Sequence, residues 1–375
     1  MISGALEVKP MSYDLGKNFT VRITGSSHGS CVAAEISGVP EGVALDMAKI
    51  ESFMARRAPG RSGLTSRRKE DDMPVFESGL TDGVTDGGPV RIVIPNNDAR
   101  SSDYEKIKDT PRPSHADYTA WVKYSGRMDM AGGGPFSGRM TAPLCAAGAV
   151  ALQLLEREGV SVGAHLLSVG YEHDDPYPLF PDRQLLEKAS GREIPVISDD
   201  AGERFRKVIL EAMESGDSVG GVVECAVTGL PAGIGGPMFS GLESALSYAV
   251  FGIPGVKGIE FGAGFSASAM RGSSCNDPFV IENGEVKTAT NNSGGIQGGI
   301  TNGMPVVFCT AFKPTPSISL PQRTVSLSKM TAETITIEGR HDPCIAVRAV
   351  PVVEAAAAVA VLDMLMEERK ENDSQ

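Results

Sequence analysis

The chain has 375 residues, a formal net charge of −12, and a composition of 41% hydrophobic and 22% charged residues. These values are typical of a globular protein that buries a sizeable core, and they argue against intrinsic disorder. The acidic balance argues against a general nucleic-acid-binding protein, whose affinity depends on cations that neutralise phosphates.

Short apolar runs rich in Val and Ile alternate with helical patterns along the chain. Strands are predicted over 19–24, 31–36, 90–94, 222–227, 306–312 and 334–337. Helices are predicted over 46–57, 143–158, 202–214 and 351–369. Because no Pro/Ser-rich linker and no repeat divides the chain, we expect one α/β domain over residues 1–375, with a disordered polar tail at about 370–375.

Membrane insertion and export are not expected. No run approaches the ~18–20 uninterrupted apolar residues of a membrane-spanning helix, and the N-terminus lacks the profile of a signal peptide. The six cysteines are scattered without CxxC or metal-like spacing. We therefore expect a cytoplasmic protein with reduced, mostly buried thiols.

A cationic segment stands out in this acidic chain. It contains no acidic residue and six basic ones, which are Arg56, Arg57, Arg61, Arg67, Arg68 and Lys69. A solvated basic loop is the ordinary explanation of such a run. The functional alternative is a binding site for a small polyanionic ligand.

Three of the five histidines lie in short polar turns: His28 in "TGSSHGS", His115 in "RPSHADY" and His341 in "GRHDPC". Imidazole titrates near neutrality, so such residues can donate a proton to a leaving group or stay charged beside an anion. No HExxH motif is present and few carboxylates adjoin these histidines, so no metal site is expected. The other two, His165 and His173, lie among ordinary helix and loop residues and are expected to be structural or solvent-exposed.

Glycine-rich turns recur as "AGGGPFSGR" at 131–139 and "NNSGGIQGGITNG" at 291–303, the latter followed by "FKPTPSIS" at 312–319. Backbone N–H groups in such turns can hold a phosphate, and Lys313 with its neighbouring hydroxyls suits an anion. Each turn alone is a weak signal. Together with the arginines, they favour a site that binds two anionic molecules.

Nine blocks occur in one order over nearly the whole chain: "GSSHG", "RRAPGRS", "NNDARSSDY", "RPSHADYT", "GGGPFSGR", "VKGIEFG", "NNSGGIQGGI", "FKPTPSIS" and "GRHDPCIAVRAVPVVEA". In this order they resemble the chorismate synthase family. The resemblance implies a single large layered β-α-β sandwich domain, an α/β (α+β) fold, that assembles as a homotetramer.

The resemblance also implies a carbon-oxygen lyase. Its substrate, 5-enolpyruvylshikimate 3-phosphate, loses phosphate and a ring hydrogen by 1,4-anti elimination to give chorismate. The reaction has no net redox change, yet the family requires reduced FMN, with NADPH as reductant in some members. The substrate's phosphate and two carboxylates, together with the flavin phosphate, would explain the concentrated arginines.

Site residues follow from the resemblance position by position. His28 matches the histidine that protonates the departing phosphate, His115 the histidine beside the flavin pyrimidine edge, and Asp342 the carboxylate near flavin N5. The positions that match FMN contacts are Pro135, Phe136, Ser137, Pro254, Gly255, Gly298, Lys313, Pro314, Thr315, Pro316, Ser317 and Arg340. The positions that match contacts with substrate or NADPH are Arg56, Arg57, Arg61 and Arg139.

The chain departs from the commonest family pattern in the glycine turn. Ala131 and Pro135 stand where arginines are frequent, Phe136 stands for Ser, and Met140 for Glu. Pro135 can donate no backbone hydrogen bond.

Two alternative functions are also considered. One is an RNA-binding module that docks through the cationic segment, and the other is a flavin-independent enzyme that acts on a phosphorylated small molecule.

Overall fold

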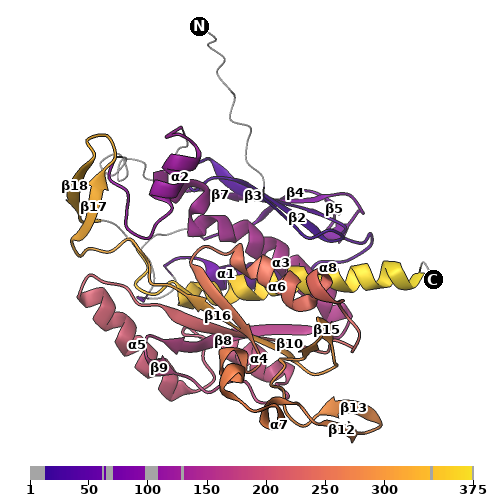
Figure 1. Ribbon diagram of the computed structural model, residues 1–375. Coiled ribbons are helices and arrows are strands. Elements are labelled where there is room, and N and C mark those ends of the chain that lie inside the picture. Colours follow the sequence, from indigo (N-terminus) through magenta and orange to yellow (C-terminus); the bar gives the residue numbers. More distant parts are fainter. Residues whose placement is uncertain are drawn as a thin grey trace.

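The computed structural model describes residues 13–60, 63–64, 71–97, 109–127, 131–337 and 341–373. These residues form layers in which buried helices lie between two antiparallel five-stranded sheets (Figure 1). The mixture of helices and sheets confirms the predicted α/β layered class.

The first sheet has the strand order β1-β2-β3-β7-β4. Its strands are β1 Tyr13–Leu15, β2 Thr20–Gly25, β3 Cys31–Ser37, β7 Val90–Pro95 and β4 Val75–Ser78. The register pairs Val32 with Ile94 and Ile36 with Val90, and all four side chains are fully buried. Because opposite residues share a face, these pairs form one apolar surface that packs on helix α3.

The second sheet has the order β11-β16-β10-β8-β9. Its strands are β11 Val256–Phe261, β16 Val306–Phe312, β10 Gly221–Thr228, β8 Ser161–Val169 and β9 Glu172–His173. One face packs on helix α8, and helices α4 (Arg183–Ser190) and α5 (Asp199–Glu214) contact β8 and β9. With helices on both faces, β8 and β10 carry nearly continuous buried runs instead of a strict alternation.

The central layer consists of α1 Met47–Arg57, α3 Thr141–Arg157, α6 Leu242–Phe251 and α8 Ala346–Asp373. Helix α3 packs directly on α8. A Cβ atom built on Gly148 of α3 would lie 2.3 Å from the Cβ of Ala355 of α8. Only glycine therefore permits this close approach of the two backbones.

Two buried carboxylates join α8 to both sheets. Glu354 accepts hydrogen bonds from the Ala164 N–H of β8 at 2.9 Å and from both terminal nitrogens of Arg56 at 2.6 and 2.7 Å. Asp363 accepts hydrogen bonds from successive backbone N–H groups between β1 and β2, over residues 17–19. Helix α8 is thus tied by side chains to both of the layers that enclose it.

The remaining elements lie at the edges of these layers. The helices are α2 Asp117–Lys123 and α7 Gly272–Cys275, and the 3-10 helices are η2 Ala131–Phe136, η3 Gly138–Met140, η4 Met238–Ser240 and η5 Gly264–Ala269. The short strands are β5 Leu80–Thr81, β6 Val84–Thr85, β12 Phe279–Glu282, β13 Glu285–Thr288, β14 Ile296–Gln297, β15 Ile300–Thr301, β17 Gln322–Ser326 and β18 Thr331–Ile335.

Most predicted elements are confirmed to within three residues, but the C-terminal helix is longer than predicted at both ends. It begins at Ala346, so Pro351 lies inside it, and it continues to Asp373. The first turn forms because Ala346, Val347 and Val350 are buried in the core. Residues 370–373, part of the expected polar tail, belong to this helix.

Two helical segments, Gly138–Arg157 and Ala346–Glu371, are long and apolar enough to cross a membrane by length and composition alone. In each segment we take the most apolar window of 18 residues. The buried share of this window is 83% in the first segment and 94% in the second. Their apolar character is accounted for by their place between the two sheets.

His165 lies in strand β8, not in a helix or loop, and is fully buried between two carboxylates. Its Nε2 is 2.8 Å from Glu224 Oε2, and its Nδ1 is 3.2 Å from Asp174 Oδ2. Burial lowers the pKa of His165, but the hydrogen bonds to Asp174 and Glu224 outweigh it and raise the pKa above 6.5. The ring is buried between two carboxylates that favour its charged form.

This pairing predicts a pH-dependent stability. Because the pKa of His165 is higher in the folded than in the unfolded chain, its stabilisation is fully present below about pH 6.5 and is lost as pH rises through the folded-state pKa. We expect His165→Gln to lower the free energy of unfolding by about 3 kcal/mol at low pH. Urea unfolding at a series of pH values measures the difference in free energy of unfolding between the parent chain and His165→Gln. His173→Gln, at an exposed histidine, is the control. A difference that stays constant as pH rises would contradict the assignment.

Candidate active site

A cavity of about 1080 Å³ lies at the N-terminal ends of α3 and α8. The loop before α2, strand β1, the end of α6 with the residues that follow it, and the segment after β16 also line it. Its volume is at the upper end of the range for small-molecule sites, so two ligands fit together. Two helix N-termini, with their unpaired N–H groups, favour anions there.

The cavity wall is cationic, although the chain as a whole is acidic. Among the described residues, the charged side chains that line it are Arg57, Arg112, Lys123, Arg139, Lys313, Arg348, Asp14 and Asp342. Six positive groups against two negative ones attract a ligand that carries several negative charges.

The glycine turn before α3 approaches His115. A Cβ atom built on Gly133 would lie 3.4 Å from both Cε1 and Nε2 of the His115 ring, and Gly133 has a φ of 88°. A side chain would be strained at this φ and would press on the imidazole. After the turn, Ser137 Oγ accepts a hydrogen bond from the Arg139 N–H at 3.3 Å, which caps η3.

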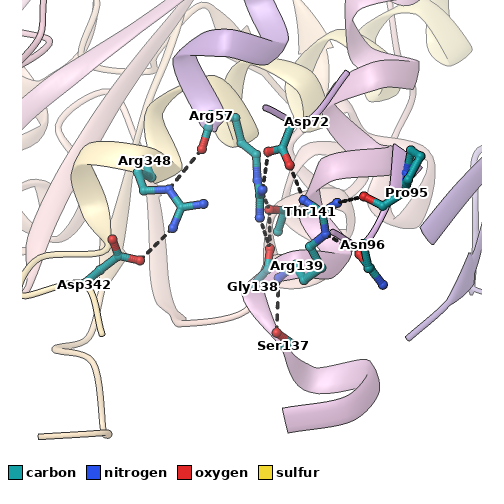
Figure 2. Close-up of polar contacts among 10 residues, drawn as sticks. All are labelled: Arg57, Asp72, Pro95, Asn96, Ser137, Gly138, Arg139, Thr141, Asp342 and Arg348. Carbon is teal, nitrogen blue, oxygen red and sulfur yellow. Dashed lines mark hydrogen bonds and ion pairs between the residues drawn. The ribbon is translucent and has the colours of Figure 1, made fainter. Parts of the chain in front are cut away.

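Asp72 lies at the centre of a buried arginine network in the cavity wall (Figure 2). Its carboxylate accepts a hydrogen bond from Arg57 Nη1 at 2.5 Å and another from Arg139 Nη1. Burial raises the pKa of Asp72, but the charges of Arg57 and Arg139 outweigh it and lower the pKa. Asp72 is therefore ionised and partly compensates two buried guanidinium groups.

Arg57 joins helix α1 to the start of α3. Its Nε donates to Thr141 Oγ1 at 3.2 Å, and its Nη2 donates to the Gly138 carbonyl oxygen at 2.7 Å. Only 4% of Arg57 is exposed. Although Arg57 lines the cavity, much of its hydrogen-bonding capacity is directed into the protein.

Asp342 is held in place by Arg348. Arg348 Nη1 donates to Asp342 Oδ2 at 2.8 Å, and Arg348 Nε donates to the Arg57 carbonyl oxygen at 3.0 Å (Figure 2). Both side chains of the pair line the cavity. The carboxylate therefore has a fixed orientation at the N-terminal end of α8.

His115 belongs to a second network, with Asp117 and Arg112. His115 Nδ1 is 2.6 Å from Asp117 Oδ1, and Arg112 donates to both Asp117 oxygens at 2.7 and 2.8 Å. Burial raises the pKa of Asp117, but hydrogen bonds from Arg112 and His115 outweigh it and hold the pKa far below its usual value. Two lone pairs would repel at 2.6 Å, so Nδ1 carries a proton and Nε2 faces the glycine turn.

His28 lies in the turn between β2 and β3 and is not among the residues that line the cavity. The side-chain nitrogen of Asn96 holds this turn through the carbonyl oxygens of Ser26 and Gly29, at 3.0 and 2.8 Å. Asn96 Oδ1 in turn accepts a hydrogen bond from Arg139 Nε at 2.8 Å. Since Arg139 lines the cavity, the turn of His28 adjoins its wall.

Most positions matched to FMN lie together in the cavity wall. They are Pro135, Phe136, Ser137, Pro254, Gly255, Lys313, Pro314, Thr315, Pro316 and Ser317. Lys313 Nζ donates to the Ser114 carbonyl oxygen, and burial together with nearby Lys257 lowers the pKa of Lys313. Gly298 lies in the turn between β14 and β15 and does not line the cavity. Arg340 lies outside the described residues.

Of the arginines matched to substrate or NADPH, two of the three that the structure describes lie together. Arg57 and Arg139 line the cavity, whereas Arg56 forms its bidentate pair with Glu354 and does not line it. Neighbouring residues on a helix point in different directions, so Arg56 and Arg57 cannot serve one ligand. Arg61 lies outside the described residues.

Several residues of the site were missed by sequence reasoning: Asp72, Asn96, Arg112, Asp117 and Arg348. Asp117 follows His115 by two residues and Arg348 follows Asp342 by six, so proximity in sequence was an available signal. Asp72 had no such signal, because its partners are brought to it only by the fold.

Comparisons with known proteins identify the family of the chain. A family model described as chorismate synthase matches residues 19–366. A chorismate synthase of Lancefieldella parvula is 41% identical over 368 residues, covering 95% of this chain and 96% of that protein. One of Thermococcus gammatolerans is 46% identical over 352 residues, covering 94% and 97%. A crystal structure of chorismate synthase aligns with a TM-score of 0.73 at 26% identity, covering 94% of this chain and 93% of that one. This chain belongs to the chorismate synthase family.

Proposed function

We propose that this chain binds 5-enolpyruvylshikimate 3-phosphate together with reduced FMN in the cavity between α3 and α8, and eliminates phosphate to give chorismate. The conversion itself is the activity of the chorismate synthase family. The observation that carries the proposed site is the cationic wall, in which six basic side chains surround a cavity large enough for two ligands.

The cavity suits a substrate with a phosphate and two carboxylates. Arg139 and Arg348 lie at the N-terminal ends of α3 and α8, where the helix N–H groups add to their charge. Arg112 and Lys313 come from the loop before α2 and from the segment after β16. Cations from separate elements of one cavity can hold a ligand by its anionic groups and orient its ring.

The residues present also fit FMN. Thr315 lines the cavity, and its Oγ1 is buried with no hydrogen-bond partner among the described residues. A buried polar group without a hydrogen bond costs free energy, so this hydroxyl oxygen favours a ligand with a polar group beside it. Ser137 and Lys313 could hold the flavin phosphate or ring edge, while Pro135 can offer only packing there. Reduced flavin, when bound, supplies transient electron donation to the substrate.

His115 has the geometry to hold a proton next to the cofactor. Asp117 fixes the proton on Nδ1, so Nε2 is the atom directed to the glycine turn. Because Asp117 is ionised and bound by Arg112, the ring keeps one orientation. With Nδ1–H donated to Asp117, a second proton on Nε2 makes the ring a cation, and in that form we assign His115 to the stabilisation of negative charge on the bound flavin.

His28 and Asp342 are the two groups proposed to move protons. His28 would protonate the leaving phosphate oxygen, which departs more easily once its charge is neutralised. Asp342, oriented by Arg348, would assist removal of the ring proton of the substrate. They come from different elements, His28 from the turn after β2 and Asp342 from the segment before α8.

The source of reduced flavin is assigned to another protein. Arg57, the position matched to NADPH, donates to Thr141 and Asp72 and is 4% exposed, which argues against a direct contact with a nucleotide. We place the enzyme in the cytoplasm as a homotetramer. In support of assembly, Met238 and Phe239 of η4 are 79% and 90% exposed.

The proposed activity can be tested by an anaerobic assay. With 5-enolpyruvylshikimate 3-phosphate and chemically reduced FMN, we expect chorismate to form, and no turnover with the flavin omitted. Absorbance of chorismate measures the product, and fluorescence titration measures FMN uptake in the presence of substrate. Equal turnover without flavin would favour the flavin-independent alternative, and no turnover in either case would overturn the proposal.

His28→Ala is expected to slow turnover by about 10²–10⁴-fold, because a general acid contributes that much when it protonates a poor leaving group. The anaerobic assay gives kcat. Ala at His173, an exposed histidine of β9, is the matched control and should leave kcat unchanged. If kcat of His28→Ala equals that of the control, His28 has no part in proton transfer.

Asp342→Asn is expected to reduce kcat by a similar factor while the FMN dissociation constant changes little, since an amide keeps the size of the carboxylate but cannot take a proton. Kinetics and flavin fluorescence measure the two quantities separately. Asp175→Asn, at an exposed carboxylate after β9, controls for loss of charge. Parallel loss of kcat and FMN affinity would make Asp342 a binding residue instead.

A further inference from the structure

We propose that Asp72 is a positioning residue that holds both proton-transfer groups, His28 and Asp342, in place from behind the cavity wall. Figure 2 shows Asp72 with Arg57, Arg139, Arg348 and Asp342. The proposal rests on the roles assigned above to these two groups. Asp72 is 3% exposed and does not itself line the cavity, so it would act through its partners.

One arm of the network leads from Asp72 to His28. The carboxylate binds Arg139 Nη1, and Arg139 Nε donates to Asn96 Oδ1 at 2.8 Å. Asn96 then holds carbonyl oxygens on either side of His28, at 3.0 and 2.8 Å. Arg139 is also fixed to the Pro95 carbonyl oxygen at 2.9 Å, so the arm is anchored on β7.

The other arm leads from Asp72 to Asp342. Arg57 Nη1 donates to Asp72 Oδ2 at 2.5 Å, and the Arg57 carbonyl oxygen accepts from Arg348 Nε at 3.0 Å. Arg348 completes the arm through its bond to Asp342 at 2.8 Å. Among the described contacts, the two arms meet at Asp72 and at the start of α3, where Arg57 binds the Gly138 carbonyl oxygen.

Charge explains why this carboxylate is needed. Three guanidinium groups, Arg57, Arg139 and Arg348, lie in this wall with two carboxylates, Asp72 and Asp342. Without Asp72, three cations would face one anion in a region of low dielectric, where like charges repel strongly. The arginines would then separate, and each arm would lose its contact with Asp72.

Asp72→Asn tests the charge directly. The variant keeps the size of the side chain, and Asn tolerates the φ of 50° found at this position. Asp71→Asn is the matched control, because Asp71 is the adjacent residue and is exposed. Hydrogen exchange is measured by mass spectrometry on the chain without ligands. The exchange rate of the backbone amides shows how well ordered the segment at the end of each arm is.

We expect exchange in Asp72→Asn to accelerate at the turn 25–30 and at 341–348, with the strands of the second sheet unchanged. We expect kcat to fall by about 10–10²-fold with KM changed less, since misplacement of catalytic groups has an effect of this size. Asp71→Asn should match the parent chain in both measurements. Unchanged exchange at either segment, or a uniform increase over the whole chain, would overturn the proposal.

If Asp72→Asn does not fold, the arms can be tested one at a time. Arg139→Lys should loosen only the turn of His28, and Arg57→Lys only residues 341–348, because lysine keeps the charge but not the paired geometry. Loosening of both segments by either variant, or of neither, would overturn the two-arm arrangement. The exchange measurement needs no activity, so a failure of the proposed roles of His28 and Asp342 would appear only in their own variants.

Discussion

The close packing of α3 on α8 at Gly148 and Ala355 sets the geometry of the molecule. Each helix covers one sheet, so their separation fixes the distance between the two sheets. Both helices also begin at the same end of the layer, where Thr141 and Arg348 line one cavity. The packing that builds the core thereby brings two helix N-termini to one place and gives the site its affinity for anions.

The site combines a cationic surface with a buried set of compensating carboxylates. Asp72 and Asp117 lie behind the arginines, where they hold guanidinium groups in place without facing the ligand. An isolated buried guanidinium would be costly, and a fully neutralised one would attract no anion. The arrangement leaves a net positive wall in a chain whose net charge is −12.

Much of the fold was predictable, because strands such as β16 carry a local apolar pattern, and the ordered motifs indicated the family. Site residues were predictable where they lie inside a recognisable sequence motif. His115 and Lys313 are examples, and the fold brings both to one cavity. Arg56 shows the limit: its pairing with Glu354, 298 residues away, follows from helix packing that no local pattern records. The start of α8 before Pro351 was missed for the same reason, since burial overrides the propensity of proline.

The cavity and the C-terminal end of the chain lie at opposite ends of helix α8. Its 28 residues, at 1.5 Å per residue, span about 42 Å. The cavity lies at its first turns, and the C-terminal end emerges on the opposite side (Figure 1). A fluorophore or surface tether attached near Asp373 would therefore leave the mouth of the cavity open, which makes this end a suitable place for immobilising or labelling the active enzyme.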